Sequence, residues 1–165
     1  MTRFHLVAIL SLALLCINCN ADLIDDVCSK SMNPSLCTKS LRSDPRSPGS
    51  DLRGLGQITI DHAQAATQVT IGVAKSLRAG GTKAKADTCV ECCTDAIDLL
   101  KECSTLLRDT RRGAIEDLKT KGSAALTDIS TCDDEFGSEE PPKLEKASHT
   151  TQDLMDILLV IANLL

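Results

Sequence analysis

Apolar residues recur every three or four positions over most of the chain, a spacing typical of amphipathic helices. The first long segment of this kind runs from Asp51 to Leu77, and the Gly80-Gly81 pair after it favours a left-handed helix cap. The second runs from Ala86 to Leu107 and separates polar from apolar side chains onto two faces. Its apolar face contains Cys89, Cys93, Ala96, Leu100, Cys103 and Leu107, and its polar face contains Glu91, Thr94, Asp95, Asp98, Lys101, Glu102 and Thr105.

Two further helices are predicted nearer the C-terminus. One runs from about Gly113 to Ile129 and the other from about Lys143 to Leu165. The stretch between them, Cys132–Pro142, is acidic and rich in turn-forming residues, so it is predicted to be a loop. Asp156 and Asn163 interrupt the apolar run of the last segment, which favours a core-facing helix over a C-terminal lipid-anchor signal.

A smaller unit precedes the long helices. Apolar residues from Leu23 to Cys28 suit one or two helical turns, and Asn33-Pro34 is a typical start for a second short helix, Ser35–Leu41. Prolines and a glycine then mark a linker. The pattern therefore predicts an all-α fold, a four-helix up-down-up-down bundle with an N-terminal α-helical hairpin: hairpin 22–42, linker 43–50 and bundle 51–165.

The start of the chain has the features of a secretory signal peptide. A basic residue, Arg3, precedes the apolar run Leu6–Ile17, which is shorter than the ~20 residues that span a bilayer. Small residues, Cys19 and Ala21, then stand three before and one before a cleavage point after Ala21. We expect residues 1–21 to be removed, no membrane-spanning helix, and a secreted mature domain of residues 22–165.

Composition excludes several function classes. The 165 residues carry 18 basic and 23 acidic side chains, a net charge of −5, so a nucleic-acid-binding surface is not expected. The chain has no Trp, no Tyr and two Phe. Nucleic-acid stacking platforms and sugar-binding clefts both depend on aromatic faces, so this composition disfavours them. The core must instead consist of Leu, Ile, Val, Ala and Met.

The cysteines carry the most specific local signal. In a secreted protein, paired cysteines are more often disulfides than metal ligands. Cys28 and Cys37 flank the Asn33-Pro34 turn, where a bridge would staple two helices too short to be stable alone. Cys89 lies near the start of the second long segment and Cys132 just after the third, and antiparallel packing brings these ends together.

Three cysteines remain after these pairs, namely Cys92, Cys93 and Cys103. A metal site formed by Cys89, Cys92 and Cys93 is an alternative, but no His or carboxylate follows at a zinc-ligand spacing, so no metal is predicted. Cys92 and Cys103 are about 16 Å apart along one helix, too far for a disulfide. Cys93 and Cys103 are expected to be buried, and Cys92, at the edge of the apolar face, to be the reactive or dimer-forming thiol.

No catalytic residue or cofactor is predicted. The histidines of the mature chain, His62 and His149, belong to no recognised triad or metal motif. The paired acids Asp133-Asp134 and Glu139-Glu140 fall in the predicted loop, without an apolar pocket to raise a pKa, so we expect them to be solvated. The chain has no glycine-rich phosphate loop.

Taken in order, these segments resemble the plant invertase and pectin methylesterase inhibitors over nearly the whole mature chain. The segments that carry the resemblance are Asn33–Cys37, Ser43–Ile58, Cys89 with Thr94–Asp98, Ser123–Leu126 with Thr131-Cys132, and Asp153–Leu165. The resemblance implies the same two disulfides, Cys28–Cys37 and Cys89–Cys132. It also shows departures: Cys93 replaces a usual Tyr, Cys92 and Cys103 are additional, and Arg108–Gly122 is longer than usual.

Members of this family divide by target enzyme. Invertase inhibitors present a short Pro-Lys-Phe-like turn between late helices, where this chain has Arg111-Arg112-Gly113. The linker and last helix look closer to the pectin methylesterase branch, whose members bind their enzyme one-to-one and cover its pectin-binding cleft. The resemblance thus implies a secreted, non-enzymatic inhibitor of pectin methylesterase in the plant apoplast or cell wall, with acid invertase as the alternative target.

The surface that the family uses lies on the long bundle helices. The candidate partner-binding residues are Glu91, Asp95, Asp98, Lys101, Glu102, Glu116 and Lys119. We expect a monomer, with dimers formed by exchange of the hairpin or through Cys92. A secreted lipid-binding helical protein is an alternative of a different class, since Cys92-Cys93 resembles the Cys-Cys pair of plant lipid-transfer proteins, although this chain is longer and lacks their Cys-X-Cys.

Overall fold

Two short helices begin the part of the chain that the structure, a computed structural model, describes: residues 23–165. The predicted signal peptide, residues 1–21, lies outside it. The first helix covers residues 23–28, and α2 (Pro34–Ser43) follows after a turn. The Asn33 side chain caps α2 by accepting a hydrogen bond from the Leu36 N–H at 3.1 Å, with Pro34 in the first turn. The Cys28–Cys37 disulfide joins the two helices.

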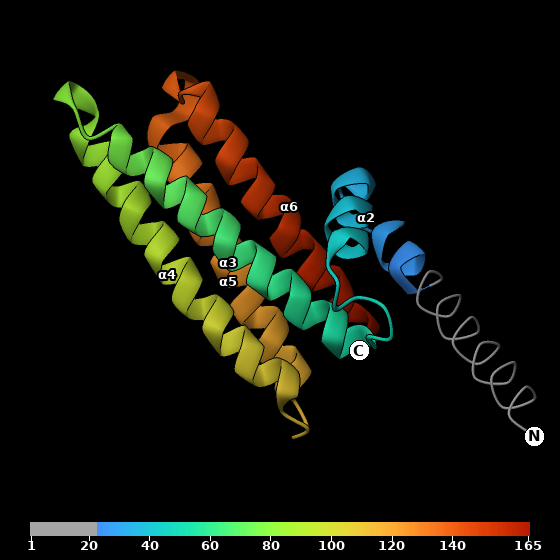
Figure 1. The fold of residues 1–165 in the computed structure, drawn as a ribbon. Helices are drawn as coiled ribbons and strands as arrows, with labels where there is room; N and C mark the ends of the chain where they lie inside the picture. Colours follow the sequence, from blue (N-terminus) through green and yellow to red (C-terminus); the bar gives the residue numbers. More distant parts are fainter. Residues whose placement is uncertain (1–22) are drawn as a thin grey trace, which may run out of the picture.

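Four long helices form the body of the molecule (Figure 1). Helices α3 and α5 each pack against both α4 and α6, so the bundle is a square in which the α4–α5 face lies opposite the α3–α6 face. Short connections make successive helices antiparallel neighbours. The predicted all-α fold is confirmed, and residues 23–165 contain no strand. The four helices are α3 (Leu52–Ser76), α4 (Lys83–Arg108), α5 (Ala114–Phe136) and α6 (Pro142–Leu164).

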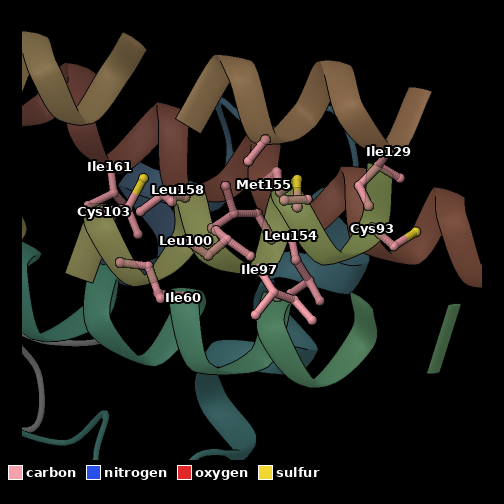
Figure 2. Packing of buried hydrophobic residues seen from close by; sticks show 14 of the residues in the cluster. Ile60, Cys93, Ile97, Leu100, Cys103, Ile129, Leu154, Met155, Leu158 and Ile161 are labelled. Carbon is pink, nitrogen blue, oxygen red and sulfur yellow. The ribbon is translucent and has the colours of Figure 1, made fainter. Parts of the chain in front are cut away.

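The core is aliphatic, as the composition requires. Each long helix contributes fully buried side chains, among them Ile60 of α3, Leu100 of α4, Ile129 of α5 and Leu158 of α6. Figure 2 shows these residues together in the centre of the bundle. Thin aliphatic side chains interdigitate between closely spaced helices without aromatic rings, so the near-absence of Phe, Tyr and Trp is compatible with a packed interior.

The third bundle helix is longer than predicted. The sequence pattern placed its end near Ile129 and a loop over Cys132–Pro142, but α5 continues to Phe136. Phe136 is 3% exposed, and its ring centroid lies 6.0 Å from the Lys85 ammonium of α4. Cys132 is itself bonded to α4. These anchors hold the last turns of α5 on the core, and they outweigh the acidic, turn-like composition that favoured a loop.

The end of α3 also differs from the prediction. The helix stops at Ser76, and Gly80-Gly81 begins a short 3-10 helix, Gly80–Thr82, instead of forming a left-handed cap. The Thr82 hydroxyl donates to the carbonyls of Leu77 (2.6 Å) and Ala79 (2.9 Å), which closes this turn.

The linker is attached to the bundle more firmly than its prolines and glycine suggest. Asp44 is buried, and its carboxylate accepts hydrogen bonds from Arg46 and lies 3.0 Å from His62 Nε2 of α3. Arg46 also pairs with Asp61 of α3. Ser47 is buried, and its hydroxyl donates to the Leu41 carbonyl of α2. Polar side chains of the linker thus bond it to α2 on one side and to α3 on the other.

Candidate functional site

The polar face of α4 carries a stripe of exposed carboxylates. Glu91, Asp95, Asp98 and Glu102 recur every three or four residues, so they lie along one side of the helix. Asp98 pairs with Lys101 at 2.6 Å, and Glu102 pairs with Lys121 of α5 at 2.7 Å. Within residues 23–165, Glu91 and Asp95 belong to no ion pair. The N-terminal half of the stripe therefore carries uncompensated negative charge.

Helix α5 runs antiparallel to α4, and this separates the candidate residues predicted on α5 from those at the start of α4. The Glu102–Lys121 pair shows that the first half of α5 lies beside the end of α4. Glu116 and Lys119, which pair with each other at 3.0 Å, belong to that first half. They therefore lie near Glu102, and the structure does not bring them to Glu91 and Asp95.

Asp128 of α5 lies beside the start of the α4 stripe, and sequence reasoning missed it. Partial burial, together with the charge of Asp95, raises the pKa of the Asp128 carboxyl. We call Glu91, Asp95, Asp98 and Asp128 the acidic patch. The signal that could have found Asp128 is the Cys89–Cys132 bridge: Asp128 precedes Cys132 by one helical turn, which places it opposite the turn that follows Cys89.

Cys92 is a half-buried free thiol next to the acidic patch. Burial is the main cause that raises the pKa of the Cys92 thiol, and the charges of Asp128, Asp95 and Glu91 raise it further. Cys92 is more accessible than buried Cys93 and Cys103, as predicted, but the raised pKa keeps it protonated. Its surroundings therefore disfavour the reactivity that the sequence suggested for it.

A groove of about 510 Å³ runs along the seam between α4 and α5, at the end opposite Asp128. The Glu102–Lys121 ion pair lies in it, and Leu106 provides apolar surface. Together, the acidic patch and this groove give the α4–α5 face both charge and concave shape. The lining residues are Glu102, Thr105, Leu106, Asp117, Thr120 and Lys121.

Two carboxyl groups near the end of α5 are only partly solvated, contrary to the prediction. Asp133 Oδ1 and Glu140 Oε1 are buried, and neither accepts a hydrogen bond from the part of the chain that the structure describes. Burial and the neighbouring Asp133 charge raise the pKa of Glu140 to about 7. The prediction was wrong for these two groups, because α5 continues past Cys132 and turns one oxygen of each inward, whereas Asp134 is exposed as predicted. Glu139, by contrast, is exposed and pairs with Lys85 at 3.0 Å.

The histidines take structural or peripheral positions. His62 lies 3.0 Å from Asp44, where hydrogen bonds from Arg46 are the main cause that holds the pKa of the Asp44 carboxyl well below its usual range. His149 is on α6, in a cleft of about 410 Å³ that also contains exposed Met32. The His62–Asp44 pair anchors the linker, and this role accounts for its geometry.

Three sulfur atoms lie together inside the bundle, but they are not those of Cys89, Cys92 and Cys93, the trio considered above as an alternative metal site and not predicted. The cluster contains Cys89, Cys93 and Cys132, whose Sγ atoms all lie within 4.8 Å of one another. Cys89 and Cys132 are bonded in a disulfide, and Cys93 is a free thiol. Cys92 is not part of this cluster and is half-buried.

None of the helices within residues 23–165 combines the length and the apolar character needed to cross a membrane.

Comparison with known proteins identifies close relatives of this chain. The family model described as plant invertase/pectin methylesterase inhibitor matches residues 22–161. A pectinesterase inhibitor from Actinidia deliciosa is 42% identical over 151 residues, covering 87% of this chain and 79% of that protein. Pectinesterase inhibitor 2 from Arabidopsis thaliana is 32% identical, covering 86% and 83% respectively. A putative invertase inhibitor from Platanus orientalis is 31% identical, covering 71% and 73%.

Two solved structures of similar fold are also of pectin methylesterase inhibitors. The crystal structure of mutant form A of a pectin methylesterase inhibitor from Arabidopsis superposes with a TM-score of 0.73 at 30% identity, covering 86% of this chain and 96% of that one. A second crystal structure, of a pectin methylesterase inhibitor from Arabidopsis thaliana, gives a TM-score of 0.61 at 29% identity, with coverage of 87% and 96%.

Proposed function

The chain belongs to the plant invertase/pectin methylesterase inhibitor family, and on this basis we propose that it is a secreted protein that inhibits pectin methylesterase. The observation that carries the proposal is the 42% identity to a pectinesterase inhibitor over 87% of this chain. The family is one of enzyme inhibitors, so the chain acts by binding an enzyme and has no catalytic role of its own.

We propose further that the inhibitor binds the enzyme one-to-one through its α4–α5 face and covers the pectin-binding cleft. Glu91 and Asp95 support this choice of face, since their carboxylates have no basic partner within the described residues. Burial raises the pKa of the Asp128 carboxyl, and the charge of nearby Asp95 raises it further, so the two carboxylates repel each other. A basic group on the enzyme would relieve this repulsion, so binding there is favoured by charge as well as by shape.

Parallel titration against two enzymes tests the target. The mature protein is added in steps to a purified pectin methylesterase and to a purified acid invertase, and residual activity is measured. We expect pectin methylesterase activity to fall to a plateau at one equivalent of inhibitor and invertase activity to stay constant. No inhibition of several pectin methylesterases at micromolar excess would refute the proposal.

Acid invertase is the second candidate target because Platanus proteins named putative invertase inhibitors match 71% of this chain at 31% and 32% identity. The turn between α4 and α5 argues against invertase as the target. It contains Arg111-Arg112-Gly113, with Gly113 at φ 93°, where invertase inhibitors present a Pro-Lys-Phe-like turn. The same titration separates the two targets. A fluorescent-lipid displacement assay on the same sample tests the lipid-binding alternative, and we expect no displacement.

Secretion to the apoplast is part of the proposal. The disulfides Cys28–Cys37 and Cys89–Cys132 support it, since such bonds persist in oxidising compartments. Sequencing the N-terminus of the protein recovered from apoplastic fluid should give a start near Asp22. Recovery of cytosolic protein that still carries the signal peptide, residues 1–21, would contradict this part of the proposal.

A further inference from the structure

Three sulfur atoms pack together between α4 and α5, and only two of them are bonded. Cys89 and Cys132 form the disulfide that joins the helices, and Cys93 lies one turn after Cys89 on α4 as a free thiol. All three Sγ atoms lie within 4.8 Å of one another, and all three residues are 0% exposed. Figure 2 shows Cys93 as part of the hydrophobic core.

We propose that this cluster is a site of internal disulfide exchange, in which Cys93 replaces Cys89 as the partner of Cys132. The Cys93 thiol loses its proton, and the thiolate attacks Sγ of Cys132. The Cys93–Cys132 bond forms as the Cys89–Cys132 bond breaks, and Cys89 leaves as a thiolate that takes up a proton. One disulfide and one thiol are present before and after, so the step needs no oxidant or reductant.

Helix geometry favours this exchange over any other among the free thiols. Cys93 follows Cys89 by four residues, about 6 Å along α4, and lies on the same face of the helix. The new bridge would therefore still join α4 to α5 and would close a loop of similar length, with nearly the same loop-closure entropy. Cys103 is about 15 Å further along α4 than Cys93, and Cys92 is outside the sulfur cluster.

The environment of Cys93 predicts how fast exchange proceeds. Burial, with smaller contributions from Cys92, Asp133 and Asp128, raises the pKa of the Cys93 thiol to about 12. The attacking thiolate is therefore scarce at acidic pH, and its fraction rises tenfold for each pH unit below that value. Exchange is thus slow in an acidic compartment and becomes measurable at mildly alkaline pH.

Disulfide mapping tests the proposal. In the Cys92→Ser/Cys103→Ser variant, Cys93 is the remaining free thiol of the mature chain. The folded protein is held without reductant near pH 5.5 and near pH 8.5, quenched in acid, unfolded and alkylated. Cleavage after Glu91 separates Cys89 from Cys93 before mass spectrometry. We expect alkylated Cys89 and a Cys93–Cys132 peptide to accumulate roughly a thousandfold faster at the higher pH, tenfold for each of three pH units.

The Cys28–Cys37 bridge is the internal control. Exchange within the folded bundle leaves this pair intact, whereas exchange through global unfolding mixes it with the other cysteines. A second variant adds Cys89→Ala, and after refolding with oxidised glutathione we expect a Cys93–Cys132 bond. The proposal is overturned if Cys93 alone is alkylated at both pH values, if Cys28 or Cys37 joins the mixed pairs, or if Cys93 and Cys132 stay free in the second variant.

Discussion

Carboxylates of the same chemical type lie in very different surroundings in this protein. Asp95 is exposed on α4 and is free to meet a partner, whereas Glu140 is folded against Asp133 at the end of α5. The local sequence around each residue is polar and gives little indication of this difference. A side chain's titration and availability depend on which other chain segment lies over it, so the next two predictions concern single carboxylates.

Charge reversal on the acidic patch should weaken inhibition without affecting the fold. Asp95→Lys with Asp98→Lys should raise the inhibition constant for pectin methylesterase at least tenfold, about 1.4 kcal/mol of binding. Both residues are exposed, so we expect unchanged helical circular dichroism and a stability change within ~0.5 kcal/mol. The matched control is Glu145→Lys on α6, which should inhibit like the wild type. Full inhibition by the double variant would place the enzyme-binding surface elsewhere.

Glu140→Gln should change how stability depends on pH. The folded-state pKa of Glu140 is raised from 4.5 to about 7, so the folded protein binds a proton that the unfolded chain releases. Stability from this group is fully present below pH 4.5 and is lost as pH rises to about 7. The variant's melting temperature should thus exceed the wild type's by a few degrees at pH 7.5 and match it near pH 4. Equal curves across this range would contradict the buried carboxyl pair.

At the scale of secondary-structure elements, packing decides where a helix ends. The periodic residues of α5 continue to Ile129, and the acidic turn composition begins at Cys132. The helix nevertheless extends to Phe136, because the buried ring and the Cys89–Cys132 bridge secure its last turns to α4. Phe136→Ala should unravel those turns and cost about 3–5 kcal/mol of unfolding free energy in urea titration. A loss below 1 kcal/mol would show that the ring does not hold them.

The hairpin depends on its own disulfide. Its two helices are shorter than the ~12 residues at which isolated helices become marginally stable. Cys28→Ser with Cys37→Ser opens a loop of about ten residues, and the chain-entropy model predicts a loss of about 2.7 kcal/mol. Urea titration, monitored by circular dichroism, measures this loss of unfolding free energy. The control is Cys103→Ala, which removes a thiol but no bridge; a comparable loss in both variants would show that the loss comes from changes in packing.

At the scale of the whole molecule, polar contacts attach the linker and the hairpin to the bundle of the same chain. Asp44 and Arg46 join the linker to His62 and Asp61 of α3, and Met32 and Asn33 of the hairpin bond to Asp156 and Asp153 of α6. Exchange of the hairpin between two chains must break these contacts first. They therefore favour the monomer.

Weakening the linker contacts should produce dimers. We expect Asp44→Ala with Arg46→Ala to raise the dimer fraction of a concentrated sample, because fewer polar contacts must then break when the hairpin detaches. Size-exclusion chromatography with light scattering measures the dimer fraction. The same pair of changes in a Cys92→Ser background is the control, since it excludes dimers linked through Cys92. A dimer that disappears in that background would be Cys92-linked and would contradict hairpin exchange.

Much of this protein was determined by its sequence alone. The apolar spacing of three and four residues predicted the long helices, because a helix has to bury one stripe of its surface. The scarcity of aromatic residues predicted an aliphatic core. The ordered segments from Asn33 to Leu165 predicted the family and, through it, the two cysteine pairs that the structure contains. Each of these properties depends on local periodicity or on residue order, which can be read along the chain.

The tertiary structure alone decided which residues meet. Antiparallel packing brought Asp128 to Asp95 and kept Glu116 and Lys119 at the other end of the face. It brought half-buried Glu140 against Asp133, attached Asp44 to His62, and placed Cys93 beside the Cys89–Cys132 bridge. Charge repulsion, desolvation and the reach of a thiol depend on distances of a few ångströms between segments that are far apart in sequence. Those distances follow from the register between helices, which spacing within one helix does not contain.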